Sequence, residues 1–174
     1  LTDVESGKTR GLPETCVECS SVAVSPDGVI LAADGGAGTL SMWNLPNGTG
    51  RRDISTGLPC INAIAFSPDG EILALSGGLF IQFWDPVKGS KLGEMKDPAG
   101  DVFCLAYSPM GDRIATAGGR VVVWDVETRT EVGVAEGDYE DAVFGIALSP
   151  DGEVAATACF DRKVRLMDVS GVGQ

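Results

Sequence analysis

Five cysteines are the most reactive side chains of this sequence. Cys16 and Cys19 form a C-x-x-C pair, a spacing found in redox and zinc sites. A zinc site needs a second pair at matching spacing, whereas Cys60, Cys104 and Cys159 are single and far apart. We therefore expect buried free thiols that behave as small apolar residues, with a disulfide or a zinc site as the alternatives.

Enzymatic chemistry finds few candidates, because the 174 residues include no histidine. This absence excludes Ser–His and Cys–His nucleophile pairs, histidine-ligated zinc and an imidazole base. The glycine-rich stretch 34–38 is not expected to bind phosphate, because it joins two predicted strands and does not open a helix. The sequence predicts a protein that is not an enzyme, with no catalytic residue, cofactor or metal.

Carboxylates are densest in the segment 136–144, which also carries two aromatic residues. One interpretation is a solvated loop that keeps the protein soluble. The other is a docking site for a basic segment, with Tyr139 as its aromatic anchor. The acidic members of the segment are Glu136, Asp138, Glu140 and Asp141.

The net charge of −12 argues against nucleic acid as a partner, because phosphate binding requires a basic surface. No apolar run reaches the length needed to span a bilayer, so no membrane association is expected. The odd number of cysteines favours a reducing compartment, and the expected location is the cytoplasm.

The elements that position these residues follow from a motif written four times. Ser-Pro-x-Gly begins at Ser25, Ser67, Ser108 and Ser149, at intervals of 42, 41 and 41 residues, with aspartate as the third residue in all but the Ser108 copy. Proline and glycine in this order are typical of a tight turn. A period near 40 residues is typical of stacked supersecondary units that cannot bury their apolar faces alone.

Each motif lies between two apolar runs and is followed by a third that ends near Trp43, Trp84, Trp124 or Met167. The run before the turn is apolar on both faces, which predicts an inner strand covered on both sides. Glycine pairs at 77–78 and 118–119 predict hairpins that need positive φ. Weaker fourth strands are expected at 51–55, 91–96 and 131–135, so each unit should hold four antiparallel strands.

Ser-Pro-Asp-Gly followed about 15 residues later by Trp-Asp resembles the WD-repeat β-propeller family. The resemblance covers essentially the whole chain and implies an all-β fold with four blades of four strands. The family often has a Gly-His pair whose histidine joins a hydrogen-bond network to the tryptophan. This chain has no histidine, and only its fourth unit has the matching aspartate, Asp161, so we expect blades held mainly by apolar packing.

The resemblance implies one propeller domain, 1–174, with blades near 16–56, 57–97, 98–137 and 138–174. Residues 1–15 would form an outer-strand segment that could complete the last blade. Two arrangements stay open, since four blades are few for this family: a homodimer that closes an eight-bladed ring, or a piece of a longer propeller. A strained four-bladed ring is a third, less favoured arrangement.

The family resemblance implies a non-catalytic scaffold that binds a protein or peptide, with a basic segment as one candidate. The alternatives are a regulatory or sensor portion of a larger protein, and an enzyme with a carboxylate pair in the central channel. Partner-binding candidates come from the loops that enter each first strand and from the second hairpins: Asn62, Asp101, Phe103, Arg120, Glu136, Asp138, Tyr139, Glu140, Asp141, Phe144, Phe160 and Arg162.

Overall fold

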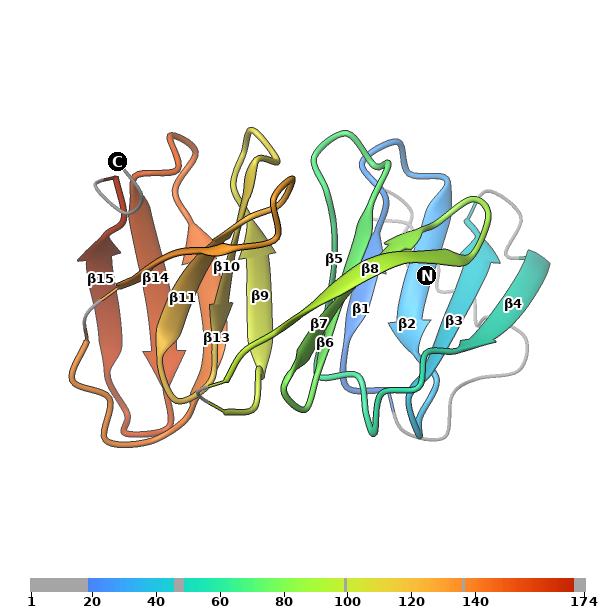
Figure 1. Cartoon of the computed structure of the whole chain (residues 1–174). Helices are drawn as coiled ribbons and strands as arrows, with labels where there is room; N and C mark the ends of the chain where they lie inside the picture. Colours follow the sequence, from blue (N-terminus) through green and yellow to red (C-terminus); the bar gives the residue numbers. More distant parts are fainter. Residues whose placement is uncertain (1–18, 46–48, 99, 136, 171–174) are drawn as a thin grey trace, which may run out of the picture.

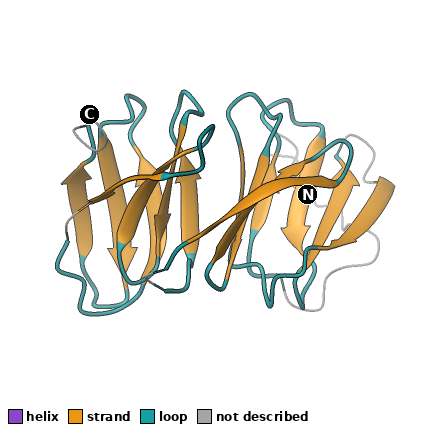
Figure 2. Cartoon of the chain, viewed as in Figure 1, coloured by secondary structure: helices purple, strands orange, loops and turns teal. Residues whose placement is uncertain are grey.

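The computed structural model describes residues 19–45, 49–98, 100–135 and 137–170. Every regular element in these ranges is a β-strand (Figure 2), which confirms the predicted all-β class. The described residues thus contain no helix that could cross a membrane. The predicted outer-strand segment 1–15 lies outside them.

The strands form four antiparallel sheets, three with four strands and the last with three among the described residues. The first sheet consists of β1 (Val22–Val24), β2 (Ile30–Asp34), β3 (Thr39–Asn44) and β4 (Thr49–Ser55). The second consists of β5 (Ala63–Phe66), β6 (Leu73–Gly77), β7 (Phe80–Asp85) and β8 (Ser90–Lys96). The third consists of β9 (Cys104–Tyr107), β10 (Arg113–Ala117), β11 (Val121–Asp125) and β12 (Glu131–Ala135). The last consists of β13 (Val143–Leu148), β14 (Val154–Cys159) and β15 (Val164–Asp168).

The sheets stand side by side in chain order, from β1–β4 at the right of Figure 1 to β13–β15 at the left. Contacts between sheets run mainly through the first strands, since β1 contacts β5, β5 contacts β9, and β9 contacts β13. The first strand of each sheet is therefore the inner strand, and the fourth strand is the outer one.

The Ser-Pro-x-Gly turns join the first strand of each sheet to the second, as predicted. Their glycines all have positive φ, between 72° and 76°. In the first turn the Ser25 hydroxyl donates to the Asp27 carboxylate at 2.5 Å, and the amide of Val29 donates to the same oxygen at 3.0 Å. These hydrogen bonds, the serine's above all, hold the pKa of Asp27 below its ordinary value.

The third turn has Met110 in place of aspartate, and a neighbouring residue takes over its role. Ser108 donates its hydroxyl to Asp112 at 2.7 Å, and the side chain of Met110 is 86% exposed. The turn therefore keeps a serine–carboxylate bond although the motif is degenerate, a substitution that the sequence did not predict.

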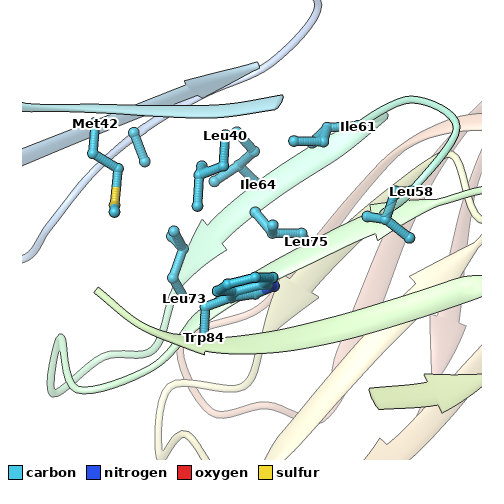
Figure 3. Packing of buried hydrophobic residues seen from close by; sticks show 9 residues of the cluster. Leu40, Met42, Leu58, Ile61, Ile64, Leu73, Leu75 and Trp84 are labelled. Carbon is cyan, nitrogen blue, oxygen red and sulfur yellow. The ribbon is translucent and has the colours of Figure 1, made fainter. Parts of the chain in front are cut away.

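Three apolar clusters fill the spaces between neighbouring sheets. Between the first two sheets, Leu40 and Met42 pack against Leu73 and the indole of Trp84 (Figure 3). The second cluster includes Phe83, which is 2% exposed, and the third includes Val121 and Val143, which are fully buried. The second and third sheets thus bury one face against the sheet before and the other against the sheet after.

On the outer face of the first sheet, Val22 and Val24 of β1 are exposed, whereas Leu31, Ala33 and Trp43 are buried. The last sheet leaves one face uncovered, as the third strands show at the positions one and three residues before the tryptophan position. These residues are at most 3% exposed in the first three sheets and 75% exposed in the last. The buried ones are Leu40, Met42, Ile81, Phe83, Val121 and Val123, and the exposed ones are Val164 and Leu166.

The prediction that every inner strand is covered on both sides is therefore wrong at the ends. In β1, Val22 is 64% exposed and Val24 is 50% exposed, because no described sheet precedes this strand. Their counterparts in the second sheet, Ile64 and Phe66, pack against the first sheet. A strand that is apolar on both faces can be covered by a sheet on each side, but each end strand has only one neighbouring sheet among the described residues.

Glycines of the second hairpins are required for close approach more than for positive φ. Gly78 has positive φ as predicted, whereas the prediction is wrong for Gly118 and Gly119. A Cβ atom on Gly118 would lie 1.8 Å from the carbonyl oxygen of Asp101, and one on Gly77 would lie 2.0 Å from that of Cys60. These hairpins press against the loop that enters the first strand of their own sheet, and a side chain has no room there.

Candidate interaction site

One edge of the stack gathers the loops that enter the first strands and the hairpins between second and third strands. Antiparallel connection places both kinds of loop at the same end, the lower edge in Figure 1. Backbone hydrogen bonds join them across sheets: Val102 donates to Gly78 at 2.8 Å, and Val143 donates to Gly118 at 2.8 Å. We call this edge the rim; the Ser-Pro-x-Gly turns lie at the opposite edge.

The rim is polar over the first two sheets. The Ser20 hydroxyl lies 2.9 Å from the carbonyl oxygen of Ile61 and 2.9 Å from the carboxylate of Asp34, and these two acceptors share its single proton. Asn62, at the equivalent position of the next repeat, donates its amide to the carbonyl oxygen of Val102 at 2.9 Å. At this position, five residues before the motif serine, a polar side chain therefore links its own sheet to the following one.

A cleft of about 360 Å³ lies at this polar part of the rim. It is lined by residues from the loops into β1 and β5 and from the β2–β3 hairpin: Cys19, Ser20, Asp34, Gly36, Ala37, Cys60, Ile61 and Asn62.

The rim is aromatic over the last two sheets. Phe103 and Phe144 occupy the position held by Ser20 and Asn62, and their rings stack with centroids 4.9 Å apart. Phe160, from the β14–β15 hairpin, meets Phe144 edge-on at 6.1 Å. The side chains of Phe144 and Phe160 are 57% and 71% exposed. Three residues that the sequence proposed separately therefore form one exposed cluster.

An irregularity in β13 places Phe144. The register of β13 against β14 shifts between Val143 and Gly145, so Phe144 has no partner opposite it. Bulges of this kind redirect a side chain out of the regular alternation. Val143 on one side is fully buried, whereas the ring of Phe144 turns to the rim and stacks on Phe103.

Acidic residues flank the aromatic cluster. Asp101 is exposed two residues before Phe103, and Asp141 is exposed beside Ala142, whose carbonyl oxygen accepts the amide of Phe160 at 2.9 Å. Glu140 pairs with Lys163 at 3.6 Å. The rim here combines exposed aromatic rings with carboxylates.

A family comparison covers more than half of the chain. The family described as "WD domain, G-beta repeat" matches residues 55–85, 89–125 and 130–168. The matches fall on the last three sheets, each with the Ser-Pro-x-Gly turn and the strand after it. The chain belongs to the WD40 repeat family. Its last three sheets match WD40 repeats, and the first sheet has the same antiparallel strand order and Ser-Pro-x-Gly turn; the predicted family and all-β fold are confirmed.

A comparison with curated proteins found a match to Coronin-7 of Rattus norvegicus. The two sequences are 41% identical over 46 residues, which is 26% of this chain. The match covers 5% of Coronin-7, a small part of that protein.

The WD40 blades contain side-chain hydrogen bonds to tryptophan that the sequence did not predict. The indole of Trp124 donates to the Thr116 hydroxyl at 2.8 Å, and that of Trp84 donates to the Gln82 amide oxygen at 3.1 Å. The indole N–H of Trp43 is buried without a partner, because Ala33 stands where Thr116 stands in the third blade. In two blades the indole N–H of the tryptophan thus has a hydrogen-bond partner, although the chain has no histidine.

Tyr139 does not lie where an exposed aromatic anchor would. It is half-buried against the third apolar cluster, and its hydroxyl lies 3.2 Å from that of Thr157, the fourth-blade counterpart of Thr116. The guanidinium of Arg165 lies 4.9 Å from the centre of its ring and also bonds Asp161 at 2.5 Å. The side-chain bond from Arg165 strongly lowers the pKa of Asp161. Tyr139 therefore holds its own blade together.

Other predicted site residues also have internal partners. Arg120 contacts Asp97 at 3.3 Å and Glu131 at 3.2 Å, so its guanidinium joins two neighbouring segments. Asp138 is exposed, and its carbonyl oxygen accepts a bond from Arg165 at 2.6 Å. Arg162 is exposed at a hairpin position with φ of 69°. Glu136 lies outside the described residues.

The cysteines only partly match the prediction of buried thiols. Cys104 is buried, and burial raises the pKa of its thiol to about 12. Cys19 and Cys60 are exposed and line the polar cleft, because the loops that carry them lie at the rim and not in a strand. Cys60, Cys104 and Cys159 are free thiols. Cys16, and with it the C-x-x-C pair, lies outside the described ranges.

The structure does not gather metal ligands in the described part of the chain. Within those ranges no three histidine, cysteine, aspartate or glutamate side chains are placed to hold a metal ion. Asp85 and Asp125, the aspartates after two of the tryptophans, accept backbone hydrogen bonds in the following turns. Those bonds lower the pKa of each carboxyl, chiefly the bond from Lys88 for Asp85 and from Thr128 for Asp125.

Proposed function

We propose that this protein is a non-catalytic scaffold that binds a protein or peptide at the rim of its third and fourth blades. The observation that carries the proposal is the cluster of Phe103, Phe144 and Phe160. Three separate segments bring these rings together, and Phe144 and Phe160 stay more than half exposed. Aromatic residues in such clusters are typical anchors of protein interfaces.

The favoured partner carries a basic segment. Asp101, Glu140 and Asp141 flank the aromatic cluster, and the whole chain has a net charge of −12. Complementary charge raises the rate of association and discriminates against acidic partners.

An affinity enrichment with matched variants tests the proposed function. Tagged wild-type protein is compared with Phe144→Ala/Phe160→Ala and with Met110→Ala, which removes an 86% exposed side chain at the opposite edge. We expect the rim variant to lose at least about nine-tenths of a specific partner, as deletion of an anchor worth about 2 kcal/mol predicts. The Met110→Ala variant should retain it. Equal recovery by all three proteins would contradict binding at the rim.

A second proposal concerns assembly: two copies pair head to tail and close an eight-bladed ring. The exposed Val164 and Leu166 of the fourth blade occupy positions that other blades bury against a following blade. Val22 and Val24 of the first blade occupy positions that other blades pack against a preceding one. One chain thus offers both halves of a blade interface, and a two-fold axis permits two such interfaces.

Light scattering after size exclusion tests this assembly. We expect a species near twice the chain mass of 18.0 kDa. Leu166→Glu should produce the monomer, because it buries a charge at the proposed interface. Val87→Glu adds the same charge at a 71% exposed site in a turn of the second blade and should leave the dimer intact. A wild-type monomer at high concentration would contradict the homodimer.

Two further expectations are also proposals. These blades could instead serve as the regulatory or sensor portion of a larger protein, which the short match to the much longer Coronin-7 supports. The cytoplasm is the proposed location, and the free thiols of Cys60, Cys104 and Cys159 support a reducing compartment.

A further inference from the structure

We propose that Phe144 and Phe160 bind an arginine side chain of the partner, with Asp101 and Asp141 as its counter-charges. This inference rests on the proposed function and names the chemistry of its site. It also moves the aromatic anchor from Tyr139, which packs inside the blade, to the rings on the rim.

Within the aromatic cluster, the stack of Phe103 on Phe144 joins the third and fourth blades, whereas Phe160 belongs to the same blade as Phe144. Ser20 and Asn62 show what this rim position does elsewhere: each donates a hydrogen bond to a carbonyl oxygen of the next repeat. Phenylalanine cannot make that bond. Between the third and fourth blades, the stack of Phe103 on Phe144 takes the place of the linking bond, and the irregularity in β13 turns Phe144 towards it. Phe144 and Phe160 nevertheless keep more than half of their surface exposed, and this exposed aromatic surface indicates recognition.

The charges around the cluster favour a cation. Among the described residues neither Asp101 nor Asp141 forms an ion pair, and both are exposed. Nearby cations are fewer or engaged: Lys163 pairs with Glu140, and Arg165 pairs with Asp161. Arg162 is the remaining exposed cation on this hairpin. A cationic side chain therefore finds exposed carboxylates in the loops that carry Phe103 and Phe144.

Arginine fits this surface better than lysine. Its planar guanidinium stacks on aromatic faces while it bonds carboxylates, and it is less strongly hydrated than an ammonium group. The protein already uses this pairing internally, with Arg165 over Tyr139 at 4.9 Å and Arg129 over Phe83 at 5.9 Å. An arginine of the partner would make the same kind of contact on the rim.

Fluorescence anisotropy with a synthetic probe tests the inference. The probe is a fluorescein-labelled peptide with three arginines separated by glycines, and its control has citrulline, the uncharged isostere, at the same places. We expect the arginine peptide to bind at least about tenfold more tightly than the citrulline peptide. Phe144→Ala/Phe160→Ala should weaken binding by about tenfold, and Met110→Ala should not change it.

Each other outcome has a defined meaning. Binding of the arginine peptide that falls with Asp101→Asn/Asp141→Asn but not with Phe144→Ala/Phe160→Ala would be general attraction to an acidic protein and would overturn the inference. Equal binding of both peptides, lost in Phe144→Ala/Phe160→Ala, would overturn the arginine assignment and leave the rim as an interaction site. If the arginine peptide did not bind but recovery of the enriched partner still fell in Phe144→Ala/Phe160→Ala, the arginine assignment would also be overturned and the rim would remain an interaction site. If Phe144→Ala/Phe160→Ala changed neither peptide binding nor recovery of the enriched partner, the proposed function would be overturned as well.

Discussion

Gly118→Ala is expected to lower the free energy of unfolding by about 3 kcal/mol, the upper range for overpacking a tight site. The new Cβ would lie 1.8 Å from the carbonyl oxygen of Asp101, and the obstacle is backbone, which cannot rotate away. Gly118 is buried where the hairpin of the third blade meets the loop entering the fourth. Urea denaturation followed by tryptophan fluorescence measures the loss, and the melting temperature should fall by about 10 °C.

Gly119→Ala is the matched control, one residue further along the same hairpin. A Cβ there meets no atom within 4 Å, and the residue is exposed without positive φ. The control should be neutral or should stabilise the protein by up to about 1 kcal/mol, because alanine restricts the unfolded chain. Similar losses for both variants would show that hairpin flexibility, and not the close approach of the hairpin to the loop that enters its blade, decides the stability.

Phe83→Ala is expected to cost about 4 kcal/mol in the free energy of unfolding. Phe83 is 2% exposed in the apolar cluster between the second and third blades, and the guanidinium of Arg129 lies over its ring. Its removal leaves a cavity that two sheets cannot both move to fill. Thermal and urea unfolding measure the effect.

Leu166→Ala provides the comparison, because Leu166 occupies the same repeat position in the fourth blade. Its side chain is 75% exposed, so the single chain should lose no more than about 0.5 kcal/mol. A larger loss that grows with protein concentration would support the head-to-tail dimer. A loss as large as that of Phe83→Ala in dilute monomer would contradict the arrangement of the blades.

The fold could be predicted because its signals are local and repeated. The Ser-Pro-x-Gly turns recur in register, and strands alternate with turns whose chemistry is readable from a few residues. The exposed ends and the role of Gly118 could not be read in this way. Whether an apolar strand is covered depends on a neighbouring blade, and the need for glycine at 118 comes from the backbone of a residue in another loop.

The site was predicted only as separate parts. The sequence pointed to Phe103, Phe144 and Phe160 through their loops, but their contact depends on the stacking of two blades and on an irregularity in β13. Tyr139 was misjudged because sequence does not show which way a loop side chain points. The threonine at 157, equivalent to the hydroxyl partner of Trp124, was the available signal that the tyrosine turns inward.

The central claim is that the aromatic rim carries recognition while the blades carry stability. The most direct measurement is the amount of specific partner bound by Phe144→Ala/Phe160→Ala relative to Met110→Ala, with melting temperatures of both recorded on the same samples. We predict that the rim variant loses the partner at an unchanged melting temperature, because both rings are exposed. Full retention of the partner by the stably folded rim variant would contradict the claim.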